Sequence, residues 1–255
     1  MNFLEGVLSA TRARVTRAKE ELLWGADAGS LTRAQRDLRS ALKGDGIALI
    51  GEIKRATPAL GVIAPQLEAE KTAKAYEQGG AAAISVLTEP DFFSGSLEDI
   101  GAAARGGLPV LHKDFLIDTY QVGEARRSGA DAVLIIARIA PGRLLVDLIE
   151  AARLLGMTPL VEVFDEEDMR RAADAGADVV GINNRDLETF EVDPHRTAEL
   201  APKAPEKAII VALSGVRDRA GIVAMEAAGA HAVLVGEVLV TAPDPAAKIA
   251  ELLGA

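Results

Sequence analysis

The feature that most constrains the fold is a short pattern that recurs along the chain, in which a helical stretch ends at glycine and an apolar run follows. A glycine at that place can adopt the left-handed conformation that closes a helix. The apolar run is too continuous for a strand with one face in water, so we expect buried parallel strands. The pattern occurs four times, with Gly80 before residues 82–88, Gly129 before 132–137, Gly176 before 179–183 and Gly229 before 232–236.

Regular alternation of strand and helix along the chain indicates a parallel sheet. Eight strand–helix units in 255 residues favour an α/β fold of the closed (β/α)8 type, a TIM barrel, over an open doubly wound sheet. No GxGxxG motif follows the first strand, as a dinucleotide-binding sheet would require. The four further strands are expected at 47–54, 108–113, 158–163 and 208–213. The helices are expected around 68–79, 97–104, 118–129, 142–156, 166–176, 195–201, 217–229 and 245–253.

The N-terminal segment, residues 1–45, is expected to be a helical extension packed on the barrel. Phe3, Leu4, Val7 and Leu8 recur at helical spacing with scattered charges after them, which is typical of an amphipathic helix and unlike a signal peptide. Because no linker rich in Pro, Gly or Ser interrupts the chain, we expect all 255 residues to form one domain. No apolar run approaches the ~20 residues that cross a bilayer, so no membrane association is expected.

Composition excludes several classes of partner. The formal net charge of −10 opposes binding to nucleic-acid phosphates, and no long Lys/Arg run overrides it locally. The chain contains no cysteine, which excludes disulfides, thiolate nucleophiles and cysteine-based zinc sites and favours a cytoplasmic protein. The three histidines are isolated and no P-loop is present, so neither a metal nor another cofactor is expected. The sequence indicates no particular protein partner.

Polar residues at the ends of the predicted strands are the candidate site residues, because active sites of such barrels lie at the C-terminal ends of the strands. Glu162 and Lys113 each follow apolar residues, where an ionisable group is costly unless it is partnered or used. A lysine and a glutamate converging in a partly dry mouth offer a general acid and a general base; a structural ion pair is the alternative. The full set is Glu52, Lys54, Thr88, Glu89, Lys113, Asp114, Glu162, Asn183, Asn184, Arg185, Ser214, Gly215, Gly236 and Glu237.

The last two strands end in Ser214-Gly215 and Gly236-Glu237, where barrels commonly hold a phosphate. Glycine lets backbone N–H groups approach the anion, although the same glycines could simply serve tight turns. The loop 57–61 after the first strand could close over a ligand or be an ordinary turn. These features predict a small phosphorylated ligand.

Several segments in order along the chain carry a resemblance to one family, the indole-3-glycerol phosphate synthases of tryptophan biosynthesis. They are GEIKRATP (51–58), SVLTEPDFFSGSLEDI (85–100), LHKDFLID (111–118), DAVLIIARI (131–139), LVEVFDEED (160–168), GINNRDLETFEVD (181–193), SGV (214–216) and VGE (235–237). The resemblance implies ring closure of 1-(2-carboxyphenylamino)-1-deoxyribulose 5-phosphate with loss of CO₂ and water. It implies no cofactor.

The resemblance also implies roles for residues of this chain. Lys113 is the general acid on the substrate carbonyl, Lys54 and Glu162 share the later proton transfers, and Glu52 orients the lysines or assists as a base. The other implied contacts are Asn183 and Arg185 for the hydroxyl and carboxylate groups, Phe115 and Leu134 for the anthranilate ring, Thr57 in place of the usual serine, Ser214 for the substrate, and Gly215, Gly236 and Glu237 for the phosphate.

Two departures from the family pattern leave alternatives open. Leu213 stands where the family usually has a glutamate, and Leu60 stands near a usual lysine. A weakly active or inactive relative that only binds the phosphorylated ligand is therefore a second hypothesis. A related sugar-phosphate isomerisation on the same barrel is a third, although the segment INNRDL and the paired lysines weigh against it.

Overall fold

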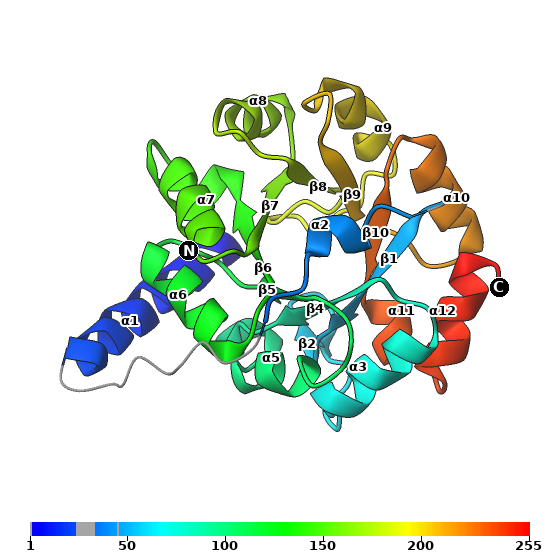
Figure 1. The fold of residues 1–255 in the computed structure, drawn as a ribbon, viewed down its shortest axis with the longest axis horizontal. Coiled ribbons are helices and arrows are strands. Elements are labelled where there is room, and N and C mark those ends of the chain that lie inside the picture. The colour runs from blue at the N-terminus through cyan, green and yellow to red at the C-terminus, as the bar shows by residue number, and fades with distance from the viewer. Residues whose placement is uncertain (1, 24–33, 45) are drawn as a thin grey trace.

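The computed structural model describes residues 2–23, 34–44 and 46–255. Eight parallel strands close into a barrel in the order β1-β10-β9-β8-β7-β6-β5-β4, and helices form a ring around it (Figure 1). This confirms the predicted (β/α)8 fold, because each predicted strand is present with ends shifted by at most a few residues. The strands are β1 (Ala48–Ile53), β4 (Ala83–Leu87), β5 (Val110–Lys113), β6 (Ala132–Ile136), β7 (Thr158–Val163), β8 (Val179–Asn183), β9 (Ile209–Leu213) and β10 (Ala232–Val235).

The helices that connect the strands also lie where the sequence predicts them. The four glycines that close the repeated pattern all have positive φ, between 74° at Gly176 and 103° at Gly129. Their left-handed backbone ends each helix and turns the chain into the next strand. The connecting helices are α3 (Ala69–Gln78), α5 (Glu98–Ala103), α6 (Thr119–Ser128), α7 (Leu144–Leu154), α8 (Glu166–Asp174), α9 (Arg196–Leu200), α10 (Arg219–Ala227) and α12 (Pro245–Leu253).

Some short elements were not predicted. The loop after β1 forms an antiparallel hairpin of β2 (Ala56–Thr57) and β3 (Gly61–Val62). Helices α4 (Pro90–Phe93) and α11 (Glu237–Val240) follow β4 and β10, and two 3₁₀ turns, η1 (Ala137–Ile139) and η2 (Ala201–Lys203), complete the set. Too short for a periodic apolar pattern, these elements leave little signal in the sequence.

Side chains of the strands alternate between the barrel interior and the helix layer. Ile50, Leu111 and Leu160 belong to the inner cluster, whereas their neighbours on each strand pack outward under the helices. Because the side-chain period of a strand is two, the polar residues two positions later also face inward, at the barrel mouth. Alternation therefore carries Glu52, Lys113 and Glu162 to one place.

Two helices of the N-terminal segment pack at opposite ends of the barrel. Helix α2 (Leu38–Ala41) and the residue after it contribute Leu38 and Leu42 to the inner cluster; Figure 1 shows α2 over the near end of the strands. Helix α1 (Phe3–Leu23) packs at the other end, the barrel mouth, and contributes the fully buried Val7 to the same inner cluster. The predicted extension also includes residues 24–33, which lie outside the described residues.

Helix α1 is tied to the barrel by ion pairs that span about a hundred residues of sequence. Arg14 Nη2 donates to both carboxylate oxygens of Asp114 at 3.1 and 3.0 Å, and Lys19 Nζ donates to Asp118 at 2.8 Å. These contacts fix α1 beside the C-terminal end of β5. They position the start of α1 at the barrel mouth.

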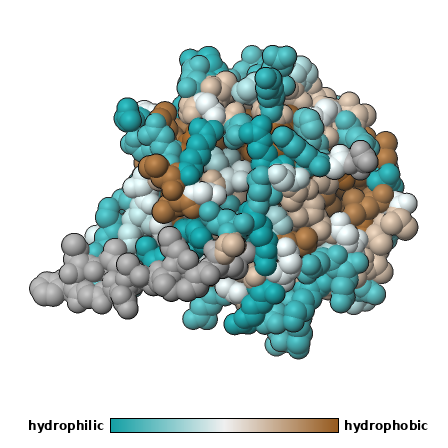
Figure 2. Space-filling view, viewed as in Figure 1, coloured by the Kyte–Doolittle hydropathy of each residue, from teal (hydrophilic) through white to brown (hydrophobic). Residues whose placement is uncertain are grey.

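The surface offers few large apolar side chains among the described residues: Leu60, Val62, Leu154, Val192 and Val223 are the exposed ones. On the face drawn in Figure 2, hydrophilic side chains predominate and brown patches are scattered. No helix in the described ranges is long and apolar enough to cross a bilayer.

Candidate active site

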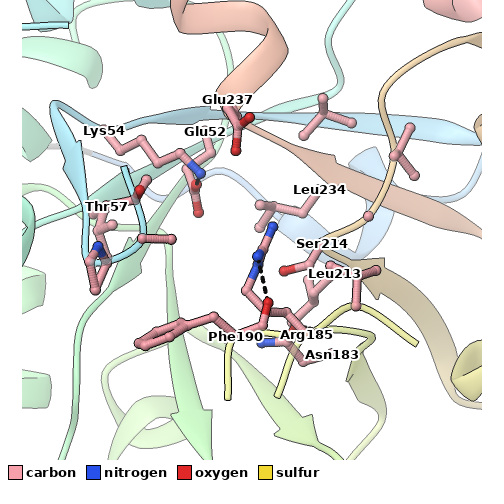
Figure 3. A pocket seen from close by; sticks show the side chains of 18 of the residues that line it. Glu52, Lys54, Thr57, Asn183, Arg185, Phe190, Leu213, Ser214, Leu234 and Glu237 are labelled. Atoms are coloured by element: carbon pink, nitrogen blue, oxygen red, sulfur yellow. Dashed lines mark hydrogen bonds and ion pairs between the residues drawn. The ribbon is translucent and has the colours of Figure 1, made fainter. Parts of the chain in front are cut away.

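A cavity of about 360 Å³ opens at the C-terminal ends of the strands. Its position follows from the fold, since the strand ends and the loops after them converge there. Most of the predicted site residues line it: Glu52, Lys54, Thr57, Lys113, Asn183, Arg185, Ser214, Gly215, Gly236 and Glu237. Figure 3 labels seven of them, among them Glu52, Lys54 and Arg185. Glu162, Phe115 and Leu134 are not among the lining residues, and each is placed below.

Two lysines share one buried carboxylate on the first strand. Lys54 Nζ lies 2.9 Å from Glu52 Oε1, and Lys113 Nζ lies 3.7 Å from Glu52 Oε2. Burial alone would raise the pKa of Glu52, but the ammonium groups of Lys54 and Lys113 outweigh it, so the pKa lies below its usual value. Glu52 therefore stays ionised and holds both ammonium groups at the mouth.

Glu162 lies just beneath the cavity, behind Asn183. Asn183 Nδ2 donates to Glu162 Oε1 at 3.1 Å, while the buried Oε2 has no hydrogen-bond partner among the described residues. Burial raises the pKa of Glu162, opposed by the charge of Lys113 and the Asn183 hydrogen bond. A buried carboxyl with a raised pKa and one open oxygen holds its proton more readily than a solvated carboxyl, which suits it to proton transfer.

The glycines that follow the last two strands, Gly215 and Gly236, are needed for different structural reasons. Gly215 has a φ of 89° and follows Ser214, whose φ of 65° is unusual for a residue with a side chain. At Gly236, an added Cβ would lie 2.5 Å from Glu52 Oε1 and 3.1 Å from Lys54 Cε. A side chain at position 236 would therefore push Glu52 and Lys54 out of the positions in which they pair.

An aromatic wall closes one side of the mouth. The ring of Phe3, at the start of α1, meets Phe92, Phe93 and Phe190 edge-on at centroid distances of 5.4, 6.2 and 5.1 Å. Phe93 lines the cavity, and Phe115 stands behind it at 6.4 Å. Phe115, predicted to contact the anthranilate ring, therefore does not line the cavity itself but packs against Phe93, which does.

Five of the six phenylalanines of the chain gather at this wall. Phe3, Phe93 and Phe190 were missed as site residues, although the scarcity of aromatic side chains was a usable signal. Leu134, in contrast, lies deeper than predicted: it is 1% exposed and belongs to the inner cluster with Leu111 and Leu160.

Glu89 explains the position of α4, which carries two of the aromatic rings. Its carboxylate accepts hydrogen bonds from the N–H groups of Asp91, Phe92 and Phe93 at 3.2, 2.7 and 3.3 Å. Pro90 begins the helix, where its missing N–H costs nothing. The Glu89 of the predicted set is therefore a helix cap and does not face the cavity.

Arg185, which follows β8, and Thr57, in β2, border the cavity. Arg185 Nη1 donates to the Phe190 carbonyl at 2.8 Å, drawn as the dashed line in Figure 3, and its guanidinium reaches into the cavity. The Thr57 hydroxyl accepts from the Leu60 N–H at 3.1 Å within the β2–β3 hairpin. The loop after the first strand is thus an ordered turn that contributes to the cavity wall.

The two departures from the family pattern differ in position. Leu213 is 1% exposed and lines the cavity from β9, whereas Leu60 is 58% exposed at the hairpin. Only Leu213 changes the chemistry of the cavity wall. Gly181 accommodates it, since a Cβ there would lie 2.9 Å from Leu213 Cδ1.

His112, Thr88 and Asp114 lie on the outer side of the strands, as alternation predicted for His112. His112 Nε2 lies 2.9 Å from Thr88 Oγ1, and Thr88 Oγ1 donates to Asp114 Oδ2 at 2.9 Å. Burial lowers the pKa of His112 to about 4. These residues do not face the cavity.

A family model described as indole-3-glycerol phosphate synthase matches residues 4–252 of this chain. The chain belongs to the indole-3-glycerol phosphate synthase family. An indole-3-glycerol phosphate synthase from Rhodococcus jostii is 44% identical, covering 100% of this chain and 96% of the relative. Another from Mycolicibacterium vanbaalenii is 49% identical over 87% of this chain and 82% of the relative. The family acts on a phosphorylated small molecule, and these relatives give no support to the hypothesis of a non-catalytic relative.

Solved structures with the same fold are more distant in sequence. A 3-hexulose-6-phosphate synthase from Salmonella typhimurium has a TM-score of 0.64 at 19% identity, covering 81% of this chain and 96% of that chain. A thiamine phosphate pyrophosphorylase from Pyrococcus furiosus has a TM-score of 0.63 at 18% identity, covering 86% and 96%. At this identity the likeness establishes the barrel and nothing about the reaction.

Proposed function

We propose that this chain closes the indole ring of 1-(2-carboxyphenylamino)-1-deoxyribulose 5-phosphate, giving indole-3-glycerol phosphate, CO₂ and water. The observation that carries the proposal is the convergence of two ammonium groups and the Glu52 carboxylate on one cavity, with a second carboxylate, Glu162, directly behind the lining residue Asn183 and with glycines after the neighbouring strands. Lys54 and Lys113 face Glu52 at 2.9 and 3.7 Å, and Glu162 lies behind Asn183. Membership of the synthase family supports the same reaction.

Lys113 acts in the first step, ring closure. Its ammonium donates a proton to the substrate carbonyl oxygen while the ring carbon that bears the carboxylate attacks the carbonyl carbon. The new carbon–carbon bond turns the carbonyl into a hydroxyl, and the positive charge of Lys113 stabilises the oxygen as its charge develops. Loss of CO₂ then returns its bonding electrons to the ring and restores aromaticity.

Lys54 and Glu162 share the proton transfers of dehydration. One protonates the departing hydroxyl and the other removes a proton from the neighbouring carbon, so water leaves and the indole double bond forms. The raised pKa of Glu162 supports this role, because burial makes the protonated carboxyl available as well as the ionised one. Glu52 remains ionised and keeps both lysines charged and oriented.

The remaining cavity residues place the substrate. Backbone N–H groups of Gly215, Gly236 and Glu237 bind the phosphate, and Ser214 adds its hydroxyl. Arg185 pairs with the substrate carboxylate, and Asn183 binds a hydroxyl. The anthranilate ring packs on the aromatic wall at Phe93, which Phe115 supports from behind; Leu134 belongs to the apolar floor and Thr57 to the rim.

The composition of the chain supports a cellular compartment and a class of partner for the reaction. The chain has no cysteine and a net charge of −10, which supports a cytoplasmic enzyme without a nucleic-acid partner. The whole chain, including the N-terminal helices, acts as one domain in this proposal, because α1 contributes Phe3 to the cavity.

The decisive test is a turnover assay with purified protein and the carboxyphenylamino substrate. We expect formation of the indole chromophore with release of CO₂ and without any added metal or cofactor. Absence of product at saturating substrate would reject the proposal.

A further inference from the structure

Asn184 directly follows the proposed substrate-binding Asn183 but lies on the other side of the chain. It is 1% exposed and does not line the active-site cavity. Its side chain connects three segments: Oδ1 accepts from the N–H and the hydroxyl of Thr197, at 3.1 and 2.8 Å, and Nδ2 donates to the Ser214 carbonyl at 3.2 Å. Asn184 thus links the loop after β8, the start of α9 and the end of β9.

The orientation of the Asn184 amide is determined by Thr197. A backbone N–H can only donate, so the N–H of Thr197 requires the oxygen of the Asn184 amide on its side. The NH₂ group must then face the opposite way, toward the Ser214 carbonyl and the Met225 sulfur at 3.7 Å. The donor to Ser214 is therefore built into the buried network.

The Ser214 carbonyl belongs to a peptide with an unusual backbone. Ser214 has a φ of 65° and Gly215 a φ of 89°, so two consecutive residues adopt the left-handed region. A residue with a side chain seldom adopts this conformation unless its surroundings hold it there. The bond from Asn184 is a contact that holds it.

A planar trans peptide places its C=O and its N–H in opposite directions. Asn184 draws the Ser214 carbonyl toward the side of Met225, away from the active-site cavity. Ser214 and Gly215 line the active-site cavity and also a second cavity beside Asn184 and Met225. With its carbonyl held by Asn184, the planar peptide is expected to turn the Gly215 N–H to the side opposite Asn184, toward the active-site cavity. A rotation of this peptide would replace a donor by a carbonyl oxygen, which repels an anion.

We propose that Asn184 is a positioning residue for the phosphate end of the site: it holds the Ser214–Gly215 peptide with its N–H toward the substrate phosphate. This inference rests on the proposed function, which assigns the phosphate to that end. Asn184 touches no substrate atom and acts only through the peptide.

The test compares the wild type with Asn184→Asp. Ionised aspartate is nearly isosteric and still accepts from Thr197, but it cannot donate to the Ser214 carbonyl. We expect KM for the phosphorylated substrate and the calorimetric Kd for inorganic phosphate both to rise roughly ten- to hundred-fold, as for loss of one hydrogen bond to a charged group. We expect kcat to change by less than about three-fold.

Two further variants, Asn184→Ala and Thr197→Val, separate the loss of the donor to Ser214 from a loss of folding. Asn184→Ala also removes the donor and buries no new charge, so it supplies the measurement if the carboxylate prevents folding, which a thermal melt reports. Thr197→Val removes one donor to Asn184 and leaves the bond to Ser214, so it should leave KM and the phosphate Kd unchanged. Unchanged phosphate affinity in a folded Asn184 variant, or an equal weakening by Thr197→Val, would overturn the inference.

The failure of the proposed function would look different. Phosphate binding by calorimetry needs no turnover, so a wild type that binds phosphate without making product would reject the reaction and leave the positioning role measurable.

Discussion

Two polar clusters lie on opposite sides of the barrel wall at the C-terminal end of β5. Their difference distinguishes a structural cluster from one suited to catalysis. On the inner side, Lys113 joins Glu52, Lys54 and Glu162, and one oxygen of Glu162 has no partner among the described residues. On the outer side, both oxygens of Asp114 are used, by Arg14, by the Thr88 hydroxyl and by the Phe115 N–H. The outer carboxylate is saturated, whereas the inner carboxylate of Glu162 keeps one oxygen that can bind a ligand or a proton.

The outer cluster also explains how the inner one is held in place. The N–H of Thr88 donates to the Lys113 carbonyl at 3.0 Å, so the backbone of Lys113 is fixed by the same residue that binds Asp114. Arg14 joins this cluster to α1, whose first residue, Phe3, lines the cavity. A substitution in the inner cluster should therefore affect turnover, and one in the outer cluster should affect stability.

The largest expected effect is that of Lys113→Ala on turnover. Loss of the general acid should lower kcat by about 10² to 10⁴-fold, while binding of inorganic phosphate and the melting temperature change little. Steady-state kinetics and calorimetry measure both quantities. Lys203→Ala, which removes an exposed lysine paired with Glu166, is the matched control and should behave as wild type. Equal loss of turnover and binding in Lys113→Ala would make the lysine structural.

The second-largest expected effect is that of His112, in the outer cluster, on the free energy of unfolding at acidic pH. The pKa of His112 is about 4 in the folded protein and 6.5 without burial, so the unfolded state binds the proton first. The stability contribution is complete above pH 6.5 and is lost as the pH falls from 6.5 toward 4, by up to about 3 kcal/mol. His112→Gln should remove this part of the dependence in urea unfolding.

The matched control for His112 is the exposed His195. His195→Gln should keep the full dependence of unfolding free energy on pH. If both variants follow the wild-type curve, His112 is not a neutral buried group and the outer cluster is not a purely structural one.

The barrel and the charged residues of the mouth could be predicted from the sequence because they depend on local rules. Alternation along β1 and β5 predicted the inward direction of Glu52 and Lys113, and glycine chemistry predicted the helix ends at positions such as Gly129. The depth at which a side chain lies along the barrel axis was harder to predict from the sequence, because it depends on the register between neighbouring strands. Leu134 was expected at the wall and lies in the inner cluster.

The aromatic wall could not be predicted in the same way, because it depends on where α1 docks. The contact that fixes α1 joins Arg14 to Asp114, which are far apart in the sequence and show no shared pattern. From the sequence, Phe3 could therefore be predicted only as part of an amphipathic helix. Its meeting with Phe190 follows from tertiary structure alone.

The third effect is that of Glu162→Gln on the pH profile. Because the pKa of Glu162 is raised above its usual value, kcat of the wild type should change across that pKa, and kcat of the variant should be lower and should not. A fall on the acidic side identifies Glu162 as a base, and a fall on the alkaline side identifies it as an acid. Identical profiles for the two proteins would remove Glu162 from the mechanism.

The smallest expected effect is that of Phe3→Ala, and it tests whether α1 belongs to the inner or the outer region. Phe3 packs edge-on against Phe92, Phe93 and Phe190 and lines the cavity, so its loss opens the mouth without touching the charged groups. Each aromatic pair contributes about 0.5–1.5 kcal/mol, so KM should rise roughly three- to ten-fold with kcat nearly unchanged. Val15→Ala is the control, because Val15 is buried on the same helix and does not line the cavity. It should lower the melting temperature and leave KM unaltered; an equal rise of KM in both variants would mean that the position of α1, and not the ring of Phe3, serves the substrate.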